Sequence, residues 1–287
     1  MAADSGRIRY RTAAVDEHEV FYREAGDPAR PALLLLHGFP TSSHMFRNLI
    51  PLLADRFHLV APDLPGFGFT TSPDGFRHTF ASLARVIERF TDVIGLRRYA
   101  IYVFDYGAPV GFRLALVRPD RVTVIVSQNG NAYEEGLSPA WDPIQRYWRE
   151  RTAAHRAALR ELLTPAMTKW QYVHGGPDET LVAPESWALD AALLARPGND
   201  GIQLDLFGDY ATNVALYPTF QEYFRARRPP ILAVWGEERP VLPAGGRGGV
   251  PARRPIGGCG FSTRGILRSR RTPRRSRRRS GASSSMP

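Results

Sequence analysis

Length and composition exclude several classes of protein. The chain has 287 residues, 43% of them hydrophobic and 11% aromatic, enough for one large buried core or two small ones. It has no apolar run of roughly eighteen residues or more, so we expect no membrane span, and no apolar stretch at its start predicts a secretory leader. A single cysteine, Cys259, argues against a disulfide framework and a multi-cysteine metal site. We therefore expect a cytoplasmic protein that needs no metal or cofactor.

The net charge of +10 belongs to one end of the sequence. Residues 237–287 contain thirteen arginines, no lysine and two acidic side chains, whereas residues 1–236 carry 25 basic and 26 acidic ones. Lys169 stands alone against 37 arginines, which is typical of a GC-rich, bacterial coding sequence. The body of the chain is therefore nearly neutral.

The first elements in chain order are predicted strands. Arg7–Val15 and Glu19–Glu24 predict a hairpin, and Pro31–His37 is the apolar run expected of a strand buried on both faces. The same character returns in His58–Pro62, Tyr99–Phe104, Val122–Ser127 and Ile231–Trp235. Stretches with helical spacing lie between them, at Met45–Ala54, Ala81–Ile94 and Ala108–Val117. This alternation predicts an α/β fold with a mostly parallel sheet covered on both faces.

Between residues 127 and 229 the pattern changes to helices without a convincing strand. The predicted helices are Pro143–Arg149, His155–Leu163, Ser186–Leu194 and Asp205–Tyr217. Helices inserted before a sheet resumes are typical of a lid over the strand ends, where ligands of open α/β sheets bind. The predicted divisions are a core at 1–130, a helical cap at 131–225, a return strand at 226–236 and a disordered basic tail at 237–287.

Two loops after predicted strands have compositions compatible with catalysis. In the HGFP loop, residues 37–40, a glycine permits a tight turn in which a following N–H can face an oxyanion. An ordinary strand-to-loop turn also explains this loop. The DLPGFG loop, residues 63–68, is interpreted as structural.

Asp105 lies where the strand Tyr99–Phe104 passes directly into the helix Ala108–Val117. Such a sharp turn can expose a nucleophile at the end of a sheet. A carboxylate there can attack an sp³ carbon and form an alkyl ester that water later cleaves. Asp is also a common helix N-cap, which is the alternative for Asp105 taken alone. The two motifs upstream, in this order, favour the nucleophile.

Together the three motifs resemble the α/β-hydrolase fold, and more narrowly its epoxide hydrolase and haloalkane dehalogenase branch. The resemblance spans about residues 7 to 236 and includes the helical cap. It implies that Asp105 is the nucleophile and that the backbone N–H groups of Phe39 and Tyr106 form the oxyanion hole. It also implies a lid tyrosine that donates to the epoxide oxygen, for which Tyr217 is the candidate; a tyrosine merely packed under the lid is the alternative. The residues that complete the motifs are His37, Gly38, Pro40 and Gly107.

The choice between the two branch activities depends on two positions. Haloalkane dehalogenases usually carry Trp after the nucleophile and Asn after the His-Gly pair, where both grip halide. Here these positions hold Tyr106 and Phe39, and the HG-x-P loop has the epoxide hydrolase form. We therefore expect an epoxide or another small apolar substrate, with a haloalkane as the alternative.

The mechanism also requires a histidine to activate water and a second acid to orient that histidine. The resemblance places the acid just after the strand Ile231–Trp235 and the histidine nearer the carboxyl end. The seven histidines are His18, His37, His44, His58, His78, His155 and His174, so none follows residue 174. We expect turnover to be impaired, unless a relocated base, His155 or His174 of the lid, reaches Asp105.

The arginine-rich tail has two interpretations. It could bind nucleic acid through phosphate contacts, on a non-catalytic fold. Alternatively, it is translated out of frame from Gly236 onward, so that it replaces the last part of the core. Codons exist for residues 237–244 that, read one base later, give Arg-Asn-Asp-Pro-Phe-Phe-Leu-Pro. Codons also exist for residues 261–266 that, read two bases later, give Leu-Asp-Thr-Gly-His. Two frame changes would thus restore an acid and a histidine in order, and we favour this hypothesis.

Overall fold

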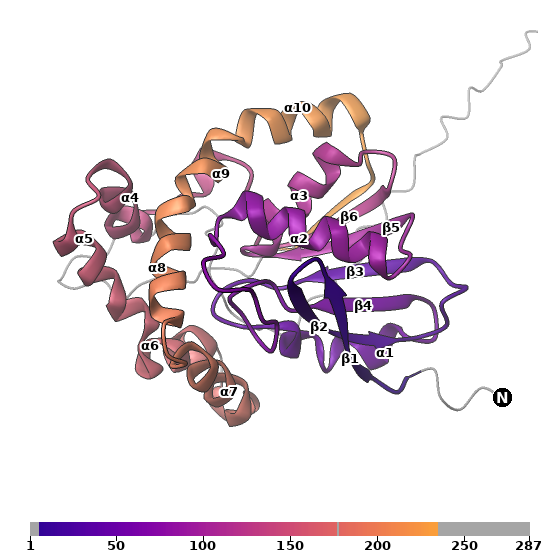
Figure 1. Ribbon diagram of the computed structural model, residues 1–287, viewed down its shortest axis with the longest axis horizontal. Helices are drawn as coiled ribbons and strands as arrows, with labels where there is room; N and C mark the ends of the chain where they lie inside the picture. The colour runs from indigo at the N-terminus through magenta and orange to yellow at the C-terminus, as the bar shows by residue number, and fades with distance from the viewer. Residues whose placement is uncertain (1–5, 177, 235–287) are drawn as a thin grey trace, which may run out of the picture.

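The computed structural model of the chain describes residues 6–176 and 178–234, which contain a seven-stranded sheet. Its strands are β1 (Arg9–Val15), β2 (His18–Ala25), β3 (Ala32–Leu36), β4 (His58–Pro62), β5 (Tyr99–Phe104), β6 (Val122–Gln128) and β7 (Ile231–Val234). Across the sheet they follow the order β1-β2-β4-β3-β5-β6-β7. β2 pairs antiparallel with β1 and β4, whereas the pairs from β4 to β7 are parallel (Figure 1). The predicted α/β fold with a mostly parallel sheet is confirmed.

The centre of the sheet is apolar because both of its faces are covered. Leu34 and Leu36 of β3 belong to the larger core, which α2 (Phe80–Val93) and α3 (Gly107–Val117) share. Leu33 and Leu35 belong to a smaller core on the opposite face. That core includes residues of η1 (Ser43–Phe46) and α1 (Leu49–Leu53). Successive side chains of a strand point to opposite faces, so one short run of leucines supplies both cores.

A helical insertion separates β6 from β7. It comprises η2 (Glu134–Gly136), η3 (Pro139–Trp141), α4 (Asp142–Arg149), α5 (Ala153–Ala158), η4 (Leu159–Leu163), α6 (Pro165–Val173), η5 (Glu179–Leu181), α7 (Pro184–Leu194), α8 (Asn199–Asp209), α9 (Ala211–Ala215) and α10 (Tyr217–Arg227). In Figure 1, α4 to α8 stand beside the sheet, and α10 returns above it.

The structure corrects the predicted helices of this insertion in three places. The helix predicted over His155–Leu163 is instead α5, which begins at Ala153, followed by the 3-10 helix η4. The helix predicted over Asp205–Tyr217 is instead parts of three consecutive helices, α8, α9 and α10. Pro218, in the first turn of α10, has no N–H to bond the carbonyl four residues earlier, which helps to end α9. Helix α6 was not predicted, although Thr164 accepts from the Met167 N–H as its N-cap and a proline follows at the first helical position. Its mixed polar and aromatic composition gave no clear apolar stripe.

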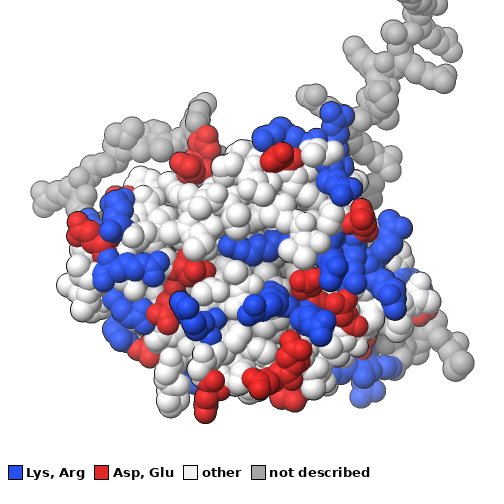
Figure 2. Space-filling model, turned by 45° about the horizontal axis from the view of Figure 1, so that its top comes forward, with Lys and Arg blue, Asp and Glu red and all other residues white. Residues whose placement is uncertain are grey.

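The predicted basic tail and both proposed frame changes lie outside the described residues. Within 6–176 and 178–234, no helix is long and apolar enough to cross a membrane. On the face of the molecule shown in Figure 2, basic and acidic side chains alternate. This mixture agrees with the near-neutral balance of residues 1–236.

Candidate active site

Asp105 occupies a strained turn between β5 and α3. Its φ of +48° lies in the left-handed region, which side chains other than glycine rarely adopt. The turn is tight because Gly107 passes directly over β3, where an added Cβ would lie 2.2 Å from the Leu36 carbonyl oxygen. Strain of this kind at a strand-to-helix turn holds a side chain up at the end of the sheet.

The carboxylate of Asp105 faces the HGFP loop. The Phe39 N–H donates to Asp105 Oδ1 at 2.8 Å, and the Tyr106 N–H also interacts with the carboxylate. Gly38 allows the approach, since a Cβ there would lie 2.4 Å from the Asp105 Cβ. The N-cap position of α3 is Tyr106, with no side-chain capping bond. The capping alternative for Asp105 is therefore wrong.

His37 holds the HGFP loop against the DLPGFG loop. Its buried ring uses both nitrogens: Nε2 accepts from the Leu64 N–H at 2.9 Å, and Nδ1 is 3.0 Å from the Gly38 carbonyl oxygen, to which it donates. Burial lowers the pKa of His37, in keeping with this neutral ring. With both nitrogens occupied, His37 positions the loop and is not free to act as a base.

Asp63 anchors the second motif. Its Oδ1 accepts from the Ser43 N–H at 2.7 Å, and its Oδ2 accepts from the Phe69 N–H at 2.8 Å. Gly68, with a φ of +53°, passes so close that an added Cβ would lie 1.9 Å from Asp63 Oδ2. Both oxygens of this fully buried carboxylate therefore accept hydrogen bonds from backbone N–H groups. The geometry agrees with the structural interpretation of residues 63–68.

Burial raises the proton affinity of Asp105. It raises the pKa of Asp105 to about 6, although the N–H groups of Phe39 and Tyr106 oppose the rise by stabilising the carboxylate. Asp105 is therefore mostly ionised at neutral pH. Two backbone donors aimed at one carboxyl group also suit the oxyanion of an ester that is being hydrolysed.

Aromatic side chains surround this end of β5. The Tyr106 ring lies 4.8 Å from that of Phe80, 5.9 Å from Phe39 and 5.8 Å from Tyr210, measured between centroids. Trp141, at the end of η3, lies 4.6 Å from Tyr210. These rings make the surroundings of this end of β5 largely apolar.

Two tyrosines of the helical insertion, Tyr210 and Tyr217, lie together near Asp105. Their hydroxyl oxygens are 3.5 Å apart, and both side chains are buried. Burial raises the pKa of Tyr217 to about 12 and that of Tyr210 well above its usual range, and the charge of Asp105 raises both further. Both hydroxyls thus remain protonated donors at neutral pH. The structure places the sequence candidate Tyr217, at the start of α10, near Asp105 and adds Tyr210, seven residues earlier, at the junction of α8 and α9.

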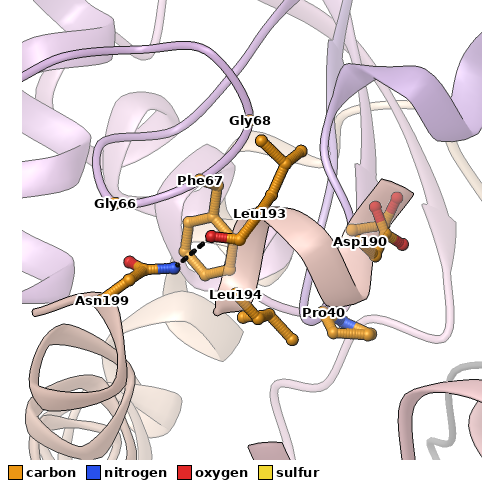
Figure 3. A pocket seen from close by; sticks show the side chains of 9 residues that line it. Pro40, Gly66, Phe67, Gly68, Asp190, Leu193, Leu194 and Asn199 are labelled. Atoms are coloured by element: carbon orange, nitrogen blue, oxygen red, sulfur yellow. Dashed lines mark hydrogen bonds between the residues drawn. The ribbon is translucent and has the colours of Figure 1, made fainter. Parts of the chain in front are cut away.

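A small hollow of about 10 Å³ lies between the helical insertion and the HGFP and DLPGFG loops. Pro40, Phe67 and the lid residues Asp190 and Leu194 help to line it (Figure 3). Asp190 is 1% exposed and accepts from the Tyr172 hydroxyl at 2.5 Å. Burial raises the pKa of Asp190 to about 7. Its place beside Pro40 connects helix α7 of the lid to the HGFP loop.

The two histidines considered as relocated bases do not approach Asp105. His155 bonds the Glu150 carbonyl oxygen at 3.0 Å, and His174 is exposed and stacks on Trp170. The end of β6, the neighbour of β5, leads into Asn129, which has no titratable side chain. Within the described parts of the chain, we find neither a base for Asp105 nor a group of three acidic, histidine or cysteine side chains able to hold a metal ion.

Comparison with known proteins identifies the family. The α/β hydrolase fold family matches residues 31–248, so the chain belongs to that family. The predicted resemblance to its epoxide hydrolase and haloalkane dehalogenase branch is confirmed by the relatives below. The protein is therefore an α/β-fold hydrolase by descent, from a family that acts on small molecules.

Two relatives illustrate how far the similarity extends. The uncharacterized hydrolase YNR064C of Saccharomyces cerevisiae is 48% identical over 235 residues, which cover 80% of this chain and 81% of the yeast protein. Haloalkane dehalogenase 2 of Mycobacterium tuberculosis is 38% identical over 135 residues, which cover 47% of this chain and 42% of that enzyme. The similarity to the dehalogenase therefore covers less than half of either chain.

Solved structures show the same fold. A candidate epoxide hydrolase from Pseudomonas aeruginosa has a TM-score of 0.67 at 21% identity, covering 83% of this chain and 81% of its own. A candidate ancestral haloalkane dehalogenase has a TM-score of 0.60 at 26% identity, and the match covers 78% of this chain and 79% of the dehalogenase. The first, at that identity, supports the fold alone.

Proposed function

We propose that this protein opens a small apolar epoxide by forming an ester on Asp105. The observation that carries the proposal is the geometry around this carboxylate: two backbone N–H donors on one side and the paired hydroxyls of Tyr210 and Tyr217 above it. Residues 131–225 would act as the lid that supplies these hydroxyls and excludes water.

In the proposed first step, a carboxylate oxygen of Asp105 attacks an epoxide carbon. A carbon–oxygen ester bond forms while the ring carbon–oxygen bond breaks, and the electron pair of the broken bond moves to the ring oxygen. That oxygen takes a proton from Tyr210, helped by a hydrogen bond from Tyr217, and Tyr210 is left as a tyrosinate. The high pKa values of these phenols keep both protonated beforehand.

In the second step, water must attack the ester carbonyl carbon, and the N–H groups of Phe39 and Tyr106 would stabilise the oxyanion. The diol leaves with the ester oxygen, and Tyr210 recovers a proton. This step needs a base, and residues 6–176 and 178–234 provide none near Asp105. We therefore propose that the chain is alkylated by epoxides but releases product slowly or not at all.

Intact-mass analysis tests this proposal directly. The full chain incubated with styrene oxide should gain the mass of one epoxide and keep it for hours, while Asp105→Ala should gain nothing. Peptide mapping should place the adduct on Asp105. Absence of an adduct in the unchanged chain, with no diol formed, would refute the proposal.

A haloalkane is the second candidate substrate, because regional relatives include haloalkane dehalogenases. A primary alkyl iodide loses iodide with its electron pair and requires no proton from the lid. The same assay with 1-iodobutane therefore distinguishes an alkylating site in general from one that suits epoxides. Preference for epoxide depends on the tyrosine pair, so Tyr210→Phe should reduce the epoxide rate alone.

A further inference from the structure

Arg113 is a buried cation close to the site that the steps above do not use. It lies on α3, two turns beyond the nucleophile, and is 8% exposed. Its Nη1 donates to the Pro109 carbonyl at 3.1 Å and to Asn213 Oδ1 at 2.6 Å, and its Nη2 lies 3.4 Å from Thr212 Oγ1. A guanidinium is costly to bury, so its retention beneath the lid requires a reason.

The partners of Arg113 fix the backbone on both sides of Tyr210. Thr212 and Asn213 follow it on α9, and Asn213 is fully buried. Asp209, directly before Tyr210, accepts from the Phe80 N–H at the start of α2 at 2.7 Å. Two core helices thus hold the lid at residues 209 and 213. Tyr210 lies between these attachments, at the junction of α8 and α9.

Arg113 also interacts electrostatically with Asp209 and Tyr210. Burial lowers its pKa to about 10, and the charges of Asp209 and Tyr210 oppose that change, so Arg113 stays protonated at neutral pH. Electrostatic attraction between Arg113 and an ionised Tyr210 is strong where water is scarce. A tyrosinate formed at Tyr210 would therefore be favoured by this guanidinium.

We propose that Arg113 is a positioning residue for epoxide opening, which holds Tyr210 over Asp105 and offsets the negative charge left when Tyr210 gives its proton to the ring oxygen. The inference rests on the proposed function. It concerns only the step in which Asp105 forms the ester, the ring bond breaks and the phenol proton moves to the new alkoxide. Alkylation by an iodide forms no alkoxide and should not depend on Arg113.

The test compares two alkylation rates in the full chain, with styrene oxide and with 1-iodobutane, both measured by intact mass. Arg113→Met should slow the epoxide reaction by about a hundredfold, the scale of a lost proton donor, and change the iodide reaction less than about threefold. Arg113→Lys, which keeps the charge but not the planar fork, should lie between the two. The control is Arg118→Met at the C-cap of the same helix, where the half-exposed Arg118 side chain pairs with Glu88; this change should alter neither rate.

The outcomes distinguish failure of the inference about Arg113 from failure of the proposed epoxide chemistry. Equal losses with both reagents in Arg113→Met would show a purely structural role and overturn the inference, while the proposed function would stand. If Arg113→Met does not fold, Asn213→Leu removes the main lid partner and must show the same selective loss of the epoxide reaction. An unchanged chain that reacts with iodide but not with epoxide would refute the proposed epoxide chemistry itself, and the inference with it.

Discussion

At the scale of single residues, the candidate site combines two buried side chains, Asp105 and Tyr210, that differ in protonation state at neutral pH. Burial raises the pKa of Asp105 only to about 6, so this proposed nucleophile is still mostly ionised at neutral pH. Burial also raises the pKa of Tyr210 well above that of a free phenol, so a donor that must be protonated remains so. Burial therefore leaves the carboxyl group ionised and the phenol protonated at the same neutral pH, before any reaction occurs.

The pKa of Asp105 predicts how alkylation depends on pH. Only the carboxylate attacks, so the rate with 1-iodobutane should rise about tenfold per pH unit well below pH 6 and level off above about pH 7. Adduct formation followed by intact mass from pH 4.5 to 8.5 checks this, with Asp105→Ala as the blank. A rate independent of pH down to 4.5 would mean that the carboxyl group is solvated as in water.

At the scale of elements, the site is built where lid helices meet core loops. Helix α7 places Asp190 beside Thr41, next to Pro40 of the HGFP loop, with Tyr172 of α6 donating to it. This buried carboxyl group has a raised pKa, so the folded chain binds its proton more tightly than the unfolded chain does. Its contribution to stability is therefore lost as pH rises from about 4 through about 7.

We expect Asp190→Asn to stabilise the chain at pH 8 and to have little effect at pH 4.5. The amide keeps an oxygen for the Tyr172 hydroxyl and removes a buried charge that costs up to about 4 kcal/mol above pH 7. Urea unfolding at the two pH values measures the difference. Glu185→Gln, an exposed change on the same helix, is the matched control and should change stability by less than about 0.5 kcal/mol at either pH. A stabilisation equal at both pH values would contradict the assignment of a buried, titrating carboxyl group.

At the scale of the whole molecule, β7 lies at the edge of the described sheet and leaves apolar surface uncovered. Ile231 and Leu232 are 48% and 57% exposed, whereas the leucines of β3 are nearly all inaccessible. Exposed side chains of this size reduce the burial that stabilises a domain and favour association. The absence of a base near Asp105 in the described residues and this exposed strand are both explained if the reading frame changes after Gly236.

Resequencing the coding DNA from codon 235 to codon 265 is the first check of that hypothesis. A chain with both frames restored, carrying the new acid and histidine, should release diol from the Asp105 ester instead of accumulating the adduct. It should also unfold at a higher denaturant concentration and bind less of a hydrophobic dye. A corrected chain that still accumulates the adduct would show that the restored acid and histidine are not the missing base.

If resequencing leaves the tail unchanged, its charge becomes the feature to explain. Thirteen arginines in residues 237–287 should then give DNA binding that weakens steeply with salt and disappears when this segment is deleted. Salt-independent binding, or binding that survives the deletion, would exclude the tail as a nucleic-acid site.

The sequence by itself was sufficient for the sheet and for the place of Asp105 at the turn after β5. The predicted bounds of every described strand are correct to within two residues, and the signal is clearest for β3 and β4, because strands buried on both faces leave a continuous apolar run. The order of the three motifs predicted Asp105 and both N–H donors, since these functions depend on local turns. The sequence also showed that no histidine follows residue 174.

Only the tertiary structure decided which distant side chains meet Asp105. Tyr210 carries no motif, and its place beside Tyr217 depends on the junctions between α8, α9 and α10, which helical periodicity alone did not reveal. The bonds from Arg113 to Thr212 and Asn213 likewise join residues about a hundred positions apart. Local patterns record the conformation of neighbouring residues, whereas contacts between a lid and a core depend on how whole helices pack.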